Sequence, residues 1–158
     1  MNPIYLTLLA IAGGVIYSLY RRHHAASQPS TFKKRRPLTS AERTLYWRLT
    51  KMLPDYIILP QVPLTRCISV KGPALEKLRS EKLDFVVCNN MMQVLLAIEL
   101  TSETGKTPYQ EEMEALIDEA FRSAGIHLIR WSSNPVPSEA YIAMELEQST
   151  LLQPLLAA

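Results

Sequence analysis

The sequence predicts an α/β fold in which helices flank a mixed β-sheet. Helix and strand signals alternate along residues 37–148 in the order helix, strand, strand, strand, helix, strand, helix. A strand–helix–strand unit over residues 94–131 is expected to form a right-handed parallel crossover, which makes the sheet mixed. The chain has 158 residues and is 47% hydrophobic, which is enough for one domain with a core and a short extra segment.

The extra segment is N-terminal, where residues 4–20 (IYLTLLAIAGGVIYSLY) carry no charge. This length approaches what a helix needs to cross a bilayer. A cleaved signal peptide would place basic residues before the apolar run, and here Arg21 and Arg22 follow it. We therefore expect a single transmembrane anchor over residues 3–20, with the N-terminus outside, the membrane contacted through residues 4–20, and the rest of the chain in the cytoplasm.

A basic linker follows over residues 21–36, which contain six basic and no acidic side chains. Its run of Lys33, Lys34, Arg35 and Arg36 could contact nucleic acid or anionic lipid headgroups, or could act only as a signal for membrane topology. After residue 36 the chain carries 11 basic against 15 acidic residues, so the domain lacks an overall basic footprint for nucleic acid.

The domain opens with a helix whose start has a capping-box pattern, from Thr39 to Glu42. Residues 56–68 are rich in β-forming residues but are interrupted by Pro60 and Pro63, which predicts an edge strand or a bent strand.

Hydrophobic periodicity predicts four further elements, namely strands 83–88, 94–100 and 126–131 and helix 109–124. Gly125 suits the end of that helix, a last helix is capped by Ser138, and residues 149–158 form a tail. Four side chains are assigned to the core: Cys67, Cys88, Trp47 and Trp131.

Two acidic residues stand in the central apolar strands, Asp84 in the first and Glu99 in the second. If these strands pair around their turn, residues whose numbers add up to about 181–183 face each other, so Glu99 can neighbour Asp84. Neighbouring carboxylates repel unless a divalent cation binds both, and Glu42 could supply a third acid. Alternatively, Glu42 serves only the capping box, and the strand acids face solvent or pair with Lys82 and Arg130. Arg130 could also reach a phosphate.

This order of elements, with Asp on one strand and Glu on the next, resembles the PD-(D/E)xK nuclease superfamily. More closely, the chain is similar to the bacterial family called domain of unknown function 2726. The resemblance covers about residues 37–132 and rests on five segments: LTSAERTLYWRL (38–49), PDYIILPQVPL (54–64), KLDFVVCN (82–89), AIELT (97–101) and DEAFRSAGIHLIRW (118–131).

The resemblance implies a restriction-endonuclease-like fold that binds one or two Mg²⁺ ions beside a phosphodiester of DNA or RNA. It implies that Asp84 and Glu99 are metal ligands with a catalytic role, that Glu42 is an outer acid, and that Gln61 orients the water or the phosphate. Because the family is bacterial, it also implies that the anchor lies in the inner membrane.

One departure from the superfamily pattern concerns the catalytic lysine, since Thr101 stands where that lysine is expected. Lys82 or Lys106 could replace it. Met113 and Ile117 also stand where basic residues of the next helix are expected. The resemblance therefore leaves two functions open: a metal-dependent nuclease, or a catalytically degenerate nuclease-like fold that serves as an interaction or nucleic-acid-binding module.

Overall fold

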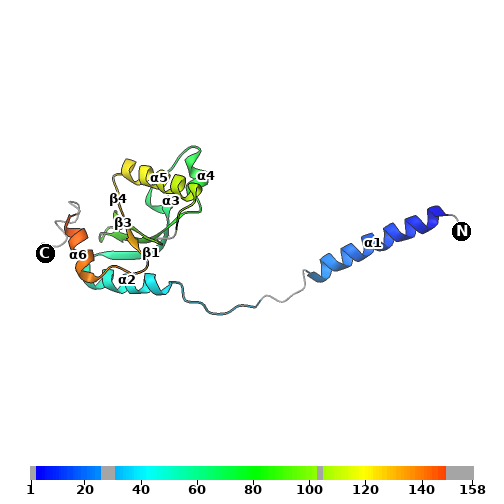
Figure 1. Ribbon diagram of the computed structural model, residues 1–158, viewed down its shortest axis with the longest axis horizontal. Helices are drawn as coiled ribbons and strands as arrows, with labels where there is room; N and C mark the ends of the chain where they lie inside the picture. The colour runs from blue at the N-terminus through cyan, green and yellow to red at the C-terminus, as the bar shows by residue number, and fades with distance from the viewer. Residues whose placement is uncertain (1–2, 26–30, 103–104, 149–158) are drawn as a thin grey trace. The chain divides into compact units, whose positions relative to one another are not determined.

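The computed structural model describes residues 3–25, 31–102 and 105–148. The chain divides into two units, Met1–Arg36 and Pro37–Ala158 (Figure 1). The predicted tail, residues 149–158, lies outside the described residues.

The first unit contains one helix, α1 (Pro3–Ala25). Among the residues that the structure describes, no helix is both long and apolar enough to span a membrane. The predicted transmembrane anchor over residues 3–20 is therefore wrong, and so is the single-pass inner-membrane location derived from it. The physical reason lies in composition, because Gly13, Gly14 and Ser18 dilute the apolar run and basic residues occupy the last turns of the helix.

The second unit is built on one four-stranded sheet with the order β1-β2-β3-β4. The strands are β1 (Ile57–Pro63), β2 (Lys82–Cys88), β3 (Val94–Thr101) and β4 (His127–Ser132). Neighbours among the first three strands are antiparallel, whereas β4 runs parallel to β3. The predicted mixed sheet is thus confirmed, with β1 at an edge, as its prolines require.

Helices cover both faces of this sheet (Figure 1). On one face lie α2 (Ser40–Met52) and α6 (Glu139–Gln148), and on the other lie α3 (Leu64–Cys67), α4 (Ala74–Leu78) and α5 (Pro108–Ser123).

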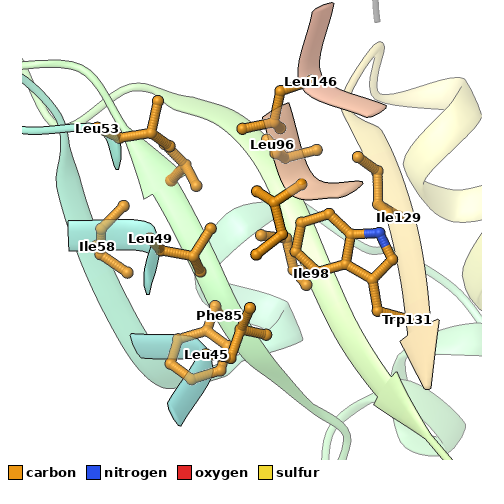
Figure 2. Close-up of a cluster of buried hydrophobic side chains, with 12 residues drawn as sticks. Leu45, Leu49, Leu53, Ile58, Phe85, Leu96, Ile98, Ile129, Trp131 and Leu146 are labelled. Atoms are coloured by element: carbon orange, nitrogen blue, oxygen red, sulfur yellow. The ribbon is translucent and has the colours of Figure 1, made fainter. Parts of the chain in front are cut away.

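The core under α2 and α6 is made of apolar side chains from every strand (Figure 2). Figure 2 shows Leu45 and Leu49 of α2 facing Phe85 and Ile98 of the sheet. Each of these four side chains is fully buried. Since each fully buried aliphatic or aromatic side chain contributes roughly 1.5–3 kcal/mol, this layer fixes α2 on the sheet.

The helix ends follow the sequence signals. Thr39 and Glu42 form the predicted capping box of α2, and Gly125 takes the left-handed backbone (φ 69°) that ends α5. Trp131 is buried as predicted, with 3% of its surface exposed, but the core assignment of Trp47 is wrong, since 68% of it is exposed. Trp47 stands two residues from Leu45, which places it on the opposite side of α2.

Candidate acidic site at one end of the sheet

Adjacent strands bring Asp84, Glu99 and Arg130 to the same end of the sheet. Phe85 pairs with Ile98 in the antiparallel ladder, so Asp84 of β2 lies opposite Glu99 of β3, within the predicted register. The parallel ladder pairs Glu99 directly with Arg130 of β4. Because side chains alternate along a strand and Arg130 reaches Asp118 of α5, Glu99 and Arg130 point to the face of the sheet that α5 covers.

Gln61 connects Asp84 to Glu42, the buried acid at the start of α2. Its side-chain Nε2 donates to Glu42 Oε1 at 2.6 Å and to Asp84 Oδ1 at 3.2 Å. Gln61 has a left-handed backbone (φ 54°), which non-glycine residues rarely adopt. Only 8% of Glu42 is exposed, and its carboxylate also accepts a hydrogen bond from the Thr39 backbone. Glu42 thus serves both the capping box and the acidic site.

The second oxygen of Asp84 is held by the neighbouring strand, since the backbone N–H of Leu100 donates to Oδ2 at 2.7 Å. Burial raises the pKa of the Asp84 carboxyl, and the nearby Glu42 charge raises that pKa further. The hydrogen bonds from Leu100 and Gln61 oppose this rise but do not cancel it. Asp84 is therefore oriented by two hydrogen-bond donors, yet it has no paired cation among the described residues.

Glu99 has a cation partner, because Arg130 Nε donates to Glu99 Oε2 at 2.9 Å. Arg130 also reaches α5, where its Nη1 donates to Asp118 Oδ1 at 2.6 Å. The ion pair is largely buried, with 22% of the Arg130 side chain and 16% of the Glu99 side chain exposed. Burial raises the pKa of Glu99, the Arg130 charge opposes that rise, and the charge of Asp84 adds to it. The alternative in which Glu99 pairs with Arg130 is thus confirmed.

The other predicted residues lie outside this group. Lys82 is exposed, and within the described part of the chain its side chain makes no hydrogen bond or ion pair. Lys106 pairs instead with Glu114, at 2.5 Å between Nζ and Oε2. The hydroxyl of Thr101, at the expected lysine position, donates to the backbone oxygen of Trp131. The basic run of the linker, Lys33, Lys34, Arg35 and Arg36, is exposed and belongs to the first unit.

Two contributors were missed from the sequence, namely Asp118 and the backbone N–H of Leu100. Asp118 lies within a segment that carries the family resemblance, but its role depends on how α5 crosses over β3 and β4. The crossover connection is the signal that could have indicated Asp118, because it places the last turns of α5 beside β4.

The number and arrangement of carboxylates at the site decide how a metal ion would be bound. Within the described ranges, no group of three or more His, Cys, Asp or Glu side chains is arranged to hold a metal ion. Both oxygens of Glu42 are already bound, one by Gln61 and one by the Thr39 backbone, which leaves Asp84 and Glu99 as candidate ligands. Mg²⁺ is commonly bound by one or two carboxylates, with waters and substrate phosphates as its other ligands, so this pair fits such an ion.

Fold and site together define an α/β domain with an acidic group at one end of a mixed sheet. The family model described as "Protein of unknown function (DUF2726)" matches residues 34–149, and the chain belongs to this family. The nearer of the two resemblances is thereby confirmed. No curated protein and no solved structure matches the chain.

Proposed function

We propose that the second unit is a nuclease-like domain that hydrolyses phosphodiester bonds of DNA or RNA with a divalent metal ion, Mg²⁺ being the natural candidate. The observation that carries the proposal is the placement of Asp84 and Glu99 opposite each other on adjacent strands, both largely shielded from water. Further support comes from the order of elements, since one helix, three antiparallel strands, a crossover helix and a parallel strand is the arrangement of the PD-(D/E)xK superfamily.

The residues of the site have distinct roles in this proposal. A magnesium ion bound by Asp84 and Glu99 supplies Lewis acidity for the phosphate and for the attacking water. Leu100 fixes the Asp84 carboxylate through its backbone N–H, and Arg130 helps to keep Glu99 ionised. Gln61 is hydrogen-bonded to Asp84 and carries an amide suited to orienting a water or a phosphate oxygen.

A specific observation favours the second function, a non-catalytic module that binds nucleic acid or a protein. The cation nearest to Glu99 is Arg130, which is already engaged by Glu99 and Asp118. Thr101 cannot supply the positive charge of the expected lysine. An arginine held by two acids is a poor proton donor, because, against the lowering effect of burial, Asp118 and Glu99 raise its pKa above its ordinary value. A site without a mobile proton donor favours binding over turnover.

The two functions are separated by an activity assay on the full chain. We expect labelled single-stranded DNA, duplex DNA or RNA to be cleaved with Mg²⁺ or Mn²⁺ and to stay intact with EDTA. Asp84→Asn and Glu99→Gln should each abolish cleavage, because each removes one metal ligand. Asp55→Asn is the matched control, since Asp55 is exposed and lies in the turn after α2, with no hydrogen bond to any of the site acids in the part of the domain that the structure describes.

Binding of the ion is measured separately by thermal melting with and without Mg²⁺. A ligand that binds only the folded state at one hundred times its Kd stabilises that state by about 2.7 kcal/mol. A melting shift that disappears in Asp84→Asn, without cleavage of any substrate, would support the non-catalytic module. Cleavage that persists in both site variants, or a melting shift equal in wild type and Asp84→Asn, would refute the proposed site.

A further inference from the structure

A pocket of about 320 Å³ opens beside Glu99, between the end of β3 and the first turns of α5. Its floor is apolar, formed by Met113 and Ile117, which are 8% and 5% exposed. The ring of Tyr109, which is 66% exposed, belongs to the same lining. The volume falls within the range of small-molecule sites, and the pocket includes one of the two proposed metal ligands.

The charged groups of this pocket are unusual for a surface that binds nucleic acid. Its lining holds the carboxylates of Glu81, Glu99 and Glu114 and the ammonium of Lys106. Lys106 is paired with Glu114, and 40% of the lysine side chain remains exposed. Because carboxylates outnumber cations, a phosphate is repelled until a divalent ion binds at Glu99. Binding of a nucleotide here therefore depends on the metal.

We propose that this pocket holds one unpaired nucleotide next to the scissile phosphate, which makes single-stranded nucleic acid the substrate class. The inference rests on the proposed function. The base stacks on Tyr109 above the apolar floor, and its phosphate is shared between the metal ion and Lys106. Aromatic rings stack on any base that is not paired, whereas a base inside a duplex has both faces covered.

Continuous duplex is disfavoured by the same charges. The domain after residue 36 carries 11 basic against 15 acidic residues, so it has no excess of cations with which to neutralise a long run of duplex phosphates. A pocket that stacks one base and holds one metal-bound phosphate does not need many cations. The affinity then comes from contacts that an unpaired strand alone can make.

The test is binding of a fluorescein-labelled decamer of thymidylate to the full chain, followed by anisotropy in Ca²⁺, which limits turnover, and repeated with EDTA. We expect binding only with the metal, and at least tenfold weaker binding of a blunt duplex of equal length. Tyr109→Ala should weaken binding of the single strand roughly 5- to 150-fold, since stacking is lost. Tyr109→Phe should keep it.

Two controls isolate the pocket from general effects. Tyr141→Ala removes another exposed tyrosine, on α6, and should bind as wild type does. The melting temperature of Tyr109→Ala should equal that of wild type, because the capping box of α5 is formed by Thr107 and Gln110.

Each contrary outcome overturns a defined claim. The inference fails if the decamer does not bind, if the duplex binds equally well, if EDTA has no effect, or if Tyr109→Ala binds normally. If Tyr109→Ala binds and cleaves normally while Asp84→Asn loses cleavage, the nuclease function stands and only the pocket assignment falls.

Discussion

Replacing Arg130 by methionine removes the cation that faces Glu99 across the parallel ladder, while keeping most of the side-chain volume. Breaking a buried ion pair on one side costs about 3–5 kcal/mol, whereas an exposed pair contributes at most about 1 kcal/mol. The side chains of Arg130 and Glu99 are 22% and 16% exposed, so this pair lies nearer the buried limit. We therefore expect Arg130→Met to lower the free energy of unfolding by about 2–3 kcal/mol at pH 7.

The pH dependence of this loss identifies its cause. Burial raises the pKa of Glu99 and the Arg130 charge opposes that rise, so without Arg130 the folded-state pKa moves further above the ordinary value of 4.5. A carboxyl with a raised folded-state pKa binds its proton more tightly when folded. The deficit of the variant should therefore shrink as the pH falls from 7 toward 4.5.

The assay is urea unfolding followed by tryptophan fluorescence, in EDTA to exclude metal effects, at several pH values. Arg130→Met combined with Glu99→Gln should recover most of the lost stability, because no uncompensated charge stays buried. Lys51→Met breaks the exposed pair with Glu139 and should cost less than about 1 kcal/mol. A deficit that is equal for Arg130→Met and Lys51→Met, or independent of pH, would refute the reasoning.

Two further predictions concern positions outside the acidic site. Gly125→Ala should lower the free energy of unfolding by about 1–2 kcal/mol in urea titrations, because φ is 69° at this position, whereas Ala124→Gly beside it should cost less. Cys67 should react slowly with a thiol reagent at pH 8 and faster as the pH approaches 11, since burial raises its pKa to about 11. Labelling of native and urea-unfolded protein at equal rates would contradict the second prediction.

Local signals predicted much of the fold because they depend on neighbouring residues. The capping box at Thr39 and Glu42, the left-handed Gly125 and the edge strand with its prolines each arise from a few adjacent residues. The placement of Asp84 opposite Glu99 was also predictable, since a hairpin fixes its own register.

The rest of the site depends on long-range geometry. Arg130 reaches Glu99 only through the register of a crossover that spans α5, and no local pattern specifies that register. Gln61 meets both Glu42 and Asp84 because its backbone is left-handed, which the sequence around it does not signal. The anchor prediction failed for a different reason: a run without charge is not apolar enough to span a membrane when residues such as Gly13, Gly14 and Ser18 interrupt it.

The double role of Glu42 links the acidic site to the first turn of α2. One of its oxygens accepts from Gln61 and the other from the backbone of Thr39, directly after the basic segment that ends at Arg36. A ligand that draws this carboxylate toward the site weakens the capping of α2. Because coupling between two sites is reciprocal, the intact cap weakens ligand binding by the same free energy. Occupancy of the site and order in the first turn of α2 are therefore thermodynamically coupled.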